Sequence, residues 1–402
     1  MYAIVDCDNF FVSCERRRRP ELEGKAVVVL SAGSAAVIAR SNEAKALGVK
    51  MSMPYFRMKE QFADRDIVAI PGDHDYYKKV SAEVMHLLHD EAPRMWQYSI
   101  DEAFLDVSGL PINLKQWGEE LATKVKASVG VPVSIGIAPT KTLAKIASHF
   151  AKRYAGYQKC CMIDTEEQRA KALQLTTIDE VWGIGRRYCE LMHANNIHTA
   201  HDLATHSRSW LKAYTSQPIV ETHDELCGID CITMREEAPN KSISNTRTFP
   251  KMLDSIEQIS TEISNFAAAC GQTLRRQHTM ARDISVFVAT NTYRQDLPQY
   301  HNQKSMRLRT PTNLSNELID AALTLLKDIY RPGYRYKRAG VTIHNITPDE
   351  ALQPDLFDWD AEKKQKLRRL NSLTDKLNAS MGKRTIVVGS QFRPDEIEEN
   401  GK

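Results

Sequence analysis

The stretch Ser99-Ile-Asp-Glu-Ala-Phe104 carries the strongest signal for the fold of this chain. Within it, Asp101 and Glu102 interrupt an apolar strand pattern that runs over residues 98–107. Neighbouring side chains of a regular strand point to opposite faces, so one of these carboxylates would enter the core. Burying an unpaired carboxylate is costly. A turn that places both carboxylates at the edge of a sheet, facing bound cations, resolves this conflict.

Asp6 ends another apolar strand, Tyr2–Cys7, and could converge on the same sheet edge. Three carboxylates at strand ends are the ligand set expected for two Mg²⁺ ions roughly 3.5–4 Å apart in phosphoryl transfer. We therefore predict that Asp6, Asp101 and Glu102 are catalytic and bind the metal ions. On spacing alone, exposed acids in a hairpin remain the alternative.

The surrounding sequence predicts an α+β fold and not a doubly wound sheet, because antiparallel-capable strands alternate with helices. Strands are predicted over residues 2–7, 25–30, 98–107 and 131–138, and helices over 41–47, 76–89 and 140–152. Short helical signals follow over 168–231, and a polar, Pro-containing linker over 232–241. Residues 242–348 mix strands (284–289, 339–343) with helices (253–268, 314–326). Residues 349–402 are a tail with one charged helix, about 360 to 380.

Composition restricts the class of protein and of partner. With 42% hydrophobic residues in 402 the chain is globular, with two to four domains. It has no apolar run of membrane-spanning length and no secretory leader, which predicts a cytoplasmic protein without a membrane partner. Its eight cysteines lack zinc-site spacing. Residues 232–348 hold 16 Lys/Arg against 10 Asp/Glu, a net +6 that favours a polyanion.

Three blocks resemble the active-site motifs of Y-family (translesion) DNA polymerases in order and separation. They are Asp6-Cys-Asp-Asn-Phe-Phe-Val-Ser-Cys-Glu15, the stretch 99–104, and Gly136-Ile-Ala-Pro-Thr-Lys-Thr-Leu-Ala-Lys145. The similarity runs through nearly the whole chain and is greatest to the UmuC branch, the catalytic subunit of bacterial DNA polymerase V. It implies template-directed, error-prone DNA synthesis across damaged DNA, by nucleotidyl transfer from a dNTP to a primer 3′-hydroxyl.

The resemblance also implies a right-hand polymerase. Its ferredoxin-like palm would span 1–165, with small fingers inserted at about 11–76. A helical thumb with a helix-hairpin-helix would span 166–231, the linker 232–241, an α+β little finger 242–348, and the tail 349–402. Asp6 and Asp101 would bridge both metals, Glu102 would lie nearer the primer terminus, and the main-chain carbonyl of Cys7 would add a ligand.

Nucleotide-binding residues follow from the same resemblance. Phe11 falls where the family places an aromatic gate under the incoming sugar, and Phe10 precedes it. The alternative is that both rings belong to the core. Lys145 and Lys152, on one helical face, are candidates for the triphosphate, with Arg40 and Lys45 of the fingers. The small side chains of residues 31–36 would leave a loose lid over the nascent base pair.

Two regions are predicted to hold the DNA duplex. Val181-Trp-Gly-Ile-Gly-Arg-Arg187 resembles a helix-hairpin-helix, in which Gly183 and Gly185 let the backbone approach a phosphate and Arg186 adds charge. A helix C-cap gives the same glycine pattern. In the little finger the candidates for phosphate contacts are Arg247, Arg282, Arg307 and Arg309.

The tail contains a candidate docking peptide. Gln353, Leu356 and Phe357 resemble the peptide by which bacterial polymerases bind the sliding clamp, with the two apolar side chains as anchors. The resemblance further implies a UmuD-type subunit and RecA as partners. The alternatives are a non-catalytic scaffold that binds DNA and the clamp, a nucleotide cyclase, and a metal-dependent nuclease; the last two leave the duplex-binding modules and the clamp peptide unexplained.

Overall fold

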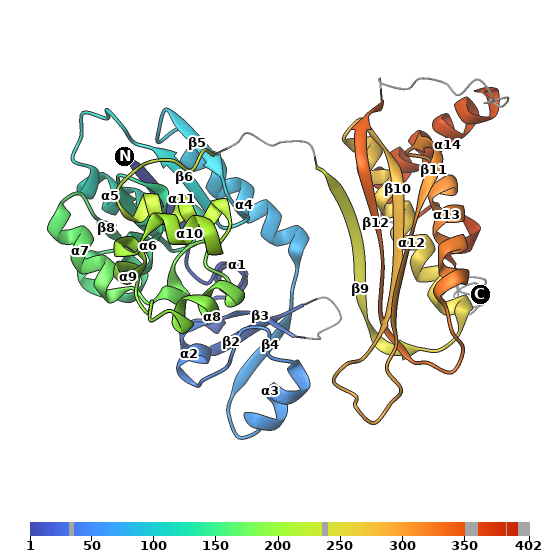
Figure 1. Ribbon diagram of the computed structural model, residues 1–402, viewed down its shortest axis with the longest axis horizontal. Coiled ribbons are helices and arrows are strands. Elements are labelled where there is room, and N and C mark those ends of the chain that lie inside the picture. Colours follow the sequence, from blue (N-terminus) through green and yellow to red (C-terminus); the bar gives the residue numbers. More distant parts are fainter. Residues whose placement is uncertain (32–35, 235–239, 350–360, 383, 393–402) are drawn as a thin grey trace. The chain divides into compact units, whose positions relative to one another are not determined.

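The computed structural model describes residues 1–31, 36–234, 240–349, 361–382 and 384–392 (Figure 1). The chain divides into two compact units, Met1–Glu236 and Glu237–Lys402. The predicted clamp peptide (Gln353, Leu356, Phe357) and residues 32–35 of the small-residue loop lie outside the described residues.

A five-stranded sheet forms the centre of the first unit. Its order is β5 (Arg94–Gln97), β6 (Glu102–Asp106), β1 (Tyr2–Cys7), β7 (Val133–Ala138), β8 (Cys160–Met162). β1 is antiparallel to both β6 and β7, and β8 runs parallel to β7. Together with the helices between the strands, this mixed sheet confirms the α+β class.

The single strand predicted over residues 98–107 is wrong. The chain reverses between β5 and β6, and the strand begins at Glu102. The amides of Tyr98 and Ser99 both donate to the Glu102 carbonyl, at 2.9 and 3.1 Å, which closes a turn. The reversal puts Asp101 in the turn and Glu102 at the start of β6, so neither side chain is forced into the core.

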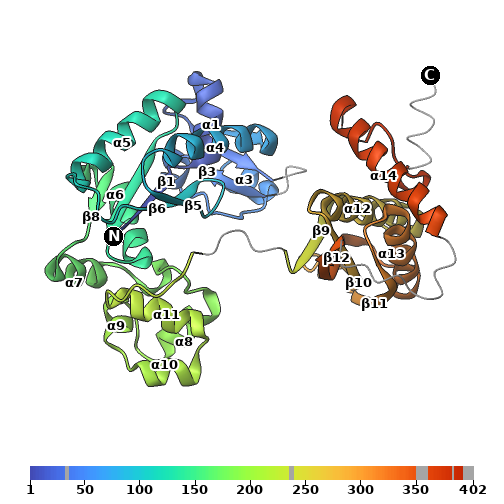
Figure 2. The same ribbon diagram turned by 90° about the horizontal axis from the view of Figure 1, so that it is seen from above.

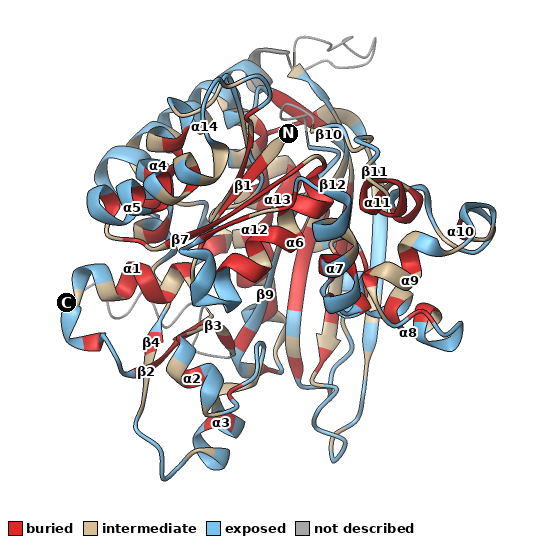
Figure 3. Ribbon diagram, turned by 90° about the vertical axis from the view of Figure 1, so that its left-hand side faces the viewer, coloured by how far each residue is buried: buried red, intermediate tan, exposed pale blue. Residues whose placement is uncertain are grey.

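Helices pack on this sheet: α1 (Phe10–Arg18), α4 (His74–His89), α5 (Leu114–Val129) and α6 (Lys141–Arg153). Thr140 caps α6, because its hydroxyl accepts from the Leu143 amide. Every residue of β7 is buried, as is most of the inner side of α6 (Figure 3). α6 crosses β7 closely at Gly136, where an added Cβ would lie 2.1 Å from Ala144 O and Ser148 N.

Gly136→Ala is therefore expected to destabilise the protein strongly. Its methyl group meets backbone atoms that cannot move aside, so the loss in unfolding free energy should reach or exceed the roughly 1–3 kcal/mol of an overpacked core. Chemical denaturation measures the loss. Gly156→Ala is the matched control, because its Cβ meets nothing within 4 Å; equal midpoints for the two variants would contradict the close packing of α6.

Two further groups of elements complete the first unit. A three-stranded sheet, in the order β3 (Val37–Arg40), β2 (Ala26–Leu30), β4 (Ile67–Pro71), packs with α2 (Asn42–Ala46) and α3 (Tyr55–Gln61). A helical part contains α7 (Glu166–Leu175), α8 (Arg186–Ala194), α9 (Ala200–Thr205), α10 (Arg208–Tyr214) and α11 (Gln217–Leu226). Buried Glu225 ties α11 to α6, since its carboxylate accepts from the Thr142 amide (2.7 Å) and hydroxyl (2.8 Å).

The second unit is a four-stranded antiparallel sheet with helices on one face (Figure 2). The order is β11 (His301–Thr312), β10 (Thr279–Thr290), β12 (Tyr336–Pro348), β9 (Ser242–Leu253). α12 (Ile256–Arg276) and α13 (Ser315–Ile329) form the core with it, and α14 (Ala361–Met381) is joined to α12 by a bidentate Arg275–Asp375 pair. Among helices of the described ranges, none combines the length and apolar character needed to cross a bilayer.

Candidate active site

The backbone of the five-stranded sheet brings the three predicted carboxylates together. Asp6 lies directly opposite Glu102 in the β1–β6 ladder, and the Cys7 amide donates to the Asp101 carbonyl at 2.9 Å. β1 and β6 are neighbours in Figure 2. Asp6 and Glu102, 96 positions apart in the sequence, thus lie at the same end of the sheet.

Each of the two strand carboxylates faces a lysine of α6. Lys152 forms an ion pair with Asp6, and Lys145 Nζ lies 3.0 and 3.1 Å from the two carboxylate oxygens of Glu102. Burial raises the pKa of Asp6 to about 7; Lys152 opposes this shift and Glu102 adds to it. Two neighbouring, largely buried carboxylates require positive charge nearby, and the lysines supply part of it.

The third carboxylate is held within its own turn, because Asp101 accepts a hydrogen bond from Ser99 Oγ at 2.5 Å. Among the described residues, no group of three or more His, Cys, Asp or Glu side chains has the geometry to hold a metal ion. Asp6 and Glu102 pair with lysines, and Asp101 pairs with Ser99. The oxygen donors Asp6, Asp101, Glu102 and the Cys7 carbonyl nevertheless fit Mg²⁺, a hard cation that prefers carboxylate and carbonyl oxygens.

Phe11 lies in α1, which follows the strand that carries Asp6, and its side chain is fixed by aromatic neighbours. Its ring stacks on Tyr77 (4.5 Å between centroids, 18°) and meets the edge of His74 (5.5 Å, 88°). The Tyr77 hydroxyl donates to buried Glu15 at 2.7 Å, and Arg18 also pairs with Glu15 at 2.7 Å. The sequence analysis missed Tyr77 and Glu15 as supports of Phe11, although Glu15 closes the first motif block.

Phe10 lies in the core, and its contact with the nucleotide stays a prediction. Its side chain is only 3% exposed and packs in the hydrophobic core, as the core alternative expects for this ring. The pattern of two adjacent phenylalanines at a helix start does not tell which one faces inward. Any contact of residue 10 with a nucleotide would have to run through its main chain.

Three predicted phosphate ligands are gathered beside β1. Lys45 Nζ lies 2.5 Å from Asn9 Oδ1, and Arg40 donates to the Val49 carbonyl at 2.7 Å. Burial lowers the pKa of Lys45, and the positive charges of Arg40 and Lys152 lower it further. The buried Nε of Arg40 has no hydrogen-bond partner among described residues. A bound anion would relieve the repulsion among these cations.

The turn of the predicted hairpin lies at Gly183, whose φ is +89°, between the short 3-10 helix Ile178–Glu180 and α8. An added Cβ there would also lie 2.9 Å from Thr222 Oγ1. Both the positive φ and the lack of space therefore favour glycine at this position. Gly185 is the N-cap of α8 with ordinary backbone angles, and a Cβ there meets nothing within 4 Å. Arg186 follows it with a 94% exposed side chain that pairs with Glu190 at 3.0 Å.

The four predicted arginines of the second unit are exposed but do not share one face. Residues directly opposite in a ladder lie on the same face. Arg307 is opposite Asp283, whereas Arg247 is opposite buried Ala339 on the helix-covered face. Arg282 sits at a register shift of β10, and Arg309 lies farther along β11. Arg338, which the sequence analysis did not single out, shares the face of Arg307 and covers the Phe287 ring at 5.5 Å.

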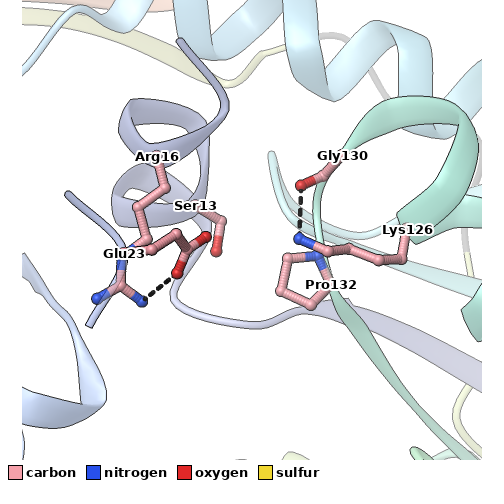
Figure 4. A pocket seen from close by; sticks show the side chains of 6 residues that line it. All are labelled: Ser13, Arg16, Glu23, Lys126, Gly130 and Pro132. Atoms are coloured by element: carbon pink, nitrogen blue, oxygen red, sulfur yellow. Dashed lines mark hydrogen bonds and ion pairs between the residues drawn. The ribbon is translucent and has the colours of Figure 1, made fainter. Parts of the chain in front are cut away.

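A small pocket of about 120 Å³ lies elsewhere, between α1 and the end of α5 (Figure 4). It is lined by Ser13, Arg16, Glu23, Lys126, Gly130 and Pro132. Arg16 is 3.5 Å from Glu23, and Lys126 donates to the Gly130 carbonyl at 3.1 Å. Its cations are therefore satisfied internally.

The comparisons with known proteins agree on one protein family. The model of the impB/mucB/samB family matches residues 5–149, and that of the family's C-terminal domain matches residues 240–356. Protein UmuC of Salmonella typhimurium (strain LT2) is 36% identical over 396 residues, covering 97% of this chain and 93% of the relative. A DNA polymerase IV of Desulfatibacillum aliphaticivorans is 26% identical over 388 residues, covering 95% and 94%.

The fold has a counterpart among solved structures. A chimeric Y-family DNA polymerase, Dbh-Dpo4-Dbh, superposes with a TM-score of 0.72 at 23% identity, covering 87% of this chain and 100% of the other. This likeness establishes the fold predicted above, with an α+β architecture of the Y-family polymerase kind.

Proposed function

Since the chain belongs to the impB/mucB/samB family and is a UmuC-like Y-family DNA polymerase, we propose that it performs error-prone, two-metal synthesis across damaged DNA. The observation that carries the proposal is the pairing of Asp6 with Glu102, beside the Cys7–Asp101 hydrogen bond. Asp6, Asp101, Glu102 and the Cys7 carbonyl would hold two Mg²⁺ ions. When bound, these ions would activate the primer 3′-hydroxyl and neutralise the negative charge of the triphosphate.

The chain's own side chains would bind and orient the nucleotide. Arg40, Lys45 and Lys152 form a cationic group that suits a triphosphate. Phe11, held against Tyr77, would pack under the deoxyribose and exclude a 2′-hydroxyl. The domain assignment follows: palm 1–165 with fingers at about 11–76, thumb 166–231, linker 232–241, little finger 242–348 and tail 349–402.

Primer-template DNA would be held by two surfaces through phosphate contacts. In the thumb these are the hairpin glycines Gly183 and Gly185 with Arg186. In the little finger Arg307 and Arg338 share one sheet face, with Arg247, Arg282 and Arg309 elsewhere on the unit. Contacts to phosphates position the protein without reading sequence, as synthesis on any template requires.

Partners outside the duplex are proposed from the family and the tail sequence. Gln353, Leu356 and Phe357 would dock in the sliding clamp, and a UmuD-type subunit and RecA would join the complex in the cytoplasm. The small residues at 31–36 would tolerate a distorted template base.

Primer extension with Mg²⁺ and dNTPs, on intact and abasic templates, tests the function. Extension past the abasic site is expected, with frequent misinsertion read by sequencing the products. The reaction should be run with and without clamp, UmuD-type subunit and RecA. No extension under any of these conditions would leave the non-catalytic scaffold as the function.

Arg186→Ala is expected to weaken primer-template binding equally on all sequences. It should also reduce the slope of log affinity against log salt by about 1, because one phosphate contact is lost. Fluorescence anisotropy across a salt series measures both. Lys171→Ala, which removes an exposed cation of α7 without a proposed contact, is the control; identical slopes for both variants would remove Arg186 from the interface.

A further inference from the structure

We propose that Lys145 is a positioning residue that orients Glu102, and that an aromatic cage of Tyr98, Phe104 and Trp182 couples this lysine to the helix-hairpin-helix loop. The inference rests on the proposed role of Glu102 in catalysis. It concerns side chains of the first unit only, and the hairpin motif by itself does not predict it.

The ion pair at the centre of the cage is specific in geometry. Lys145 Nζ donates to both oxygens of the Glu102 carboxylate, at 3.0 and 3.1 Å, so the carboxylate plane is held from one side. The two side chains are 17% and 18% exposed. Water screens such a pair less than a surface pair, and a displaced lysine would change the orientation of Glu102.

Three aromatic rings surround the same ammonium group. Nζ lies 4.5 Å from the ring centroid of Tyr98, 5.4 Å from that of Trp182 and 6.0 Å from that of Phe104. These distances lie in the range of cation–π attraction. Trp182 Nε1 also donates to the Tyr98 hydroxyl at 2.9 Å, which ties two walls of the cage together. The rings therefore restrict where the ammonium can go.

The walls of the cage come from parts of the chain with different proposed tasks. Tyr98 stands in the turn that carries Asp101, and Phe104 is in β6 two residues after Glu102. Trp182 directly precedes Gly183, the hairpin glycine, and its carbonyl accepts from Thr222 of α11 at 3.3 Å. A phosphate bound at the hairpin thus sits on the same short loop as one wall of the cage.

The consequence is that DNA binding at the hairpin is coupled to the orientation of the Glu102 carboxylate. Movement of the hairpin moves Trp182, and with it the lysine that orients Glu102. A correctly seated duplex would keep the cage closed around Lys145, and a poorly seated one would relax it. Loss of the cage should therefore lower kcat for nucleotide incorporation more than it weakens DNA binding.

A double-mutant cycle tests this coupling. Lys145→Met keeps most of the length of the side chain and removes its charge, and Trp182→Ala removes one wall. Each is expected to lower kcat roughly tenfold, while the primer-template Kd, measured separately by anisotropy, changes less than about twofold. In the double variant the Trp182→Ala substitution should lower kcat no further, because the ammonium group that Trp182 restrains is already absent. Trp182→Phe, which retains a ring, should restore most of the rate.

A matched control separates the cage from simple packing. Trp210 of α10 packs against the same hydrophobic cluster but contacts His206 and Tyr214. Trp210→Ala should lower the melting temperature as Trp182→Ala does, yet leave kcat unchanged. Should Trp182→Ala fail to fold, Tyr98→Leu removes an exposed wall instead and should show the same non-additivity with Lys145→Met.

Two results would overturn the inference. Additive losses of kcat in the double variant, or a Trp182→Ala effect confined to Kd, would show that the tryptophan acts on folding or on DNA and not through Lys145. Those results leave the proposed function intact if the parent chain extends primers in an Asp101-dependent manner. A parent without Asp101-dependent incorporation would overturn the proposed function, and the coupling with it.

Discussion

Asp101→Ala is expected to lower single-nucleotide incorporation by about 10³-fold or more, since lost metal ligation removes several kcal/mol of charge stabilisation in the transition state. Asp101 stands in the turn between β5 and β6, where its carbonyl accepts from the Cys7 amide and its carboxylate from Ser99. The substitution removes only the carboxylate and leaves the ladder of β1 and β6 in place. Rapid-quench incorporation at saturating dNTP measures the loss.

Asp106→Ala is the matched control for this prediction. Asp106 lies at the other end of β6, opposite Tyr2, and its carboxylate accepts from the Ser108 amide at 3.0 Å. The same change of charge on the same strand should leave incorporation within about twofold, because screening weakens its effect on the distant site. Comparable activity of Asp101→Ala and the parent chain would exclude Asp101 from the catalytic centre and contradict the two-metal assignment.

Phe11→Ala is expected to reduce discrimination against ribonucleotides by about 10²-fold, the upper range for a selection based on shape. The Phe11 ring is held between Tyr77 and His74, so it cannot swing away from a 2′-hydroxyl without losing both contacts. Removing the ring opens the space that the hydroxyl needs. The measurement is kcat/KM for each dNTP and its matching rNTP.

Tyr76→Leu is the control for the gate. Tyr76 neighbours Tyr77 in α4 and lies under the Arg18 guanidinium, 4.7 Å from its ring centroid. Loss of this nearby ring should leave sugar discrimination unchanged. Equal discrimination by Phe11→Ala and the parent chain would show that another group excludes the ribose hydroxyl.

Local patterns predicted much of the fold correctly. The strand Tyr2–Cys7 and the helix after Thr140 were expected within a residue of their observed bounds, since a short apolar run and the capping residue Thr140 are local features of the sequence. The strand over residues 98–107 was placed wrongly because the turn that interrupts it is closed by backbone bonds to Glu102. Side-chain pattern alone does not show such bonds.

For the candidate site, too, part was predictable from the sequence and part was not. The sequence by itself determined the family and the α+β class and predicted the candidate carboxylates Asp6, Asp101 and Glu102, because motif spacing and residue chemistry are local properties of the chain. Only the tertiary structure decided that Asp6 faces Glu102, that Phe10 is core while Phe11 stacks on Tyr77, and that Trp182 encloses Lys145. These are contacts between residues up to about a hundred positions apart, and they follow from strand register and close packing, which no local pattern encodes.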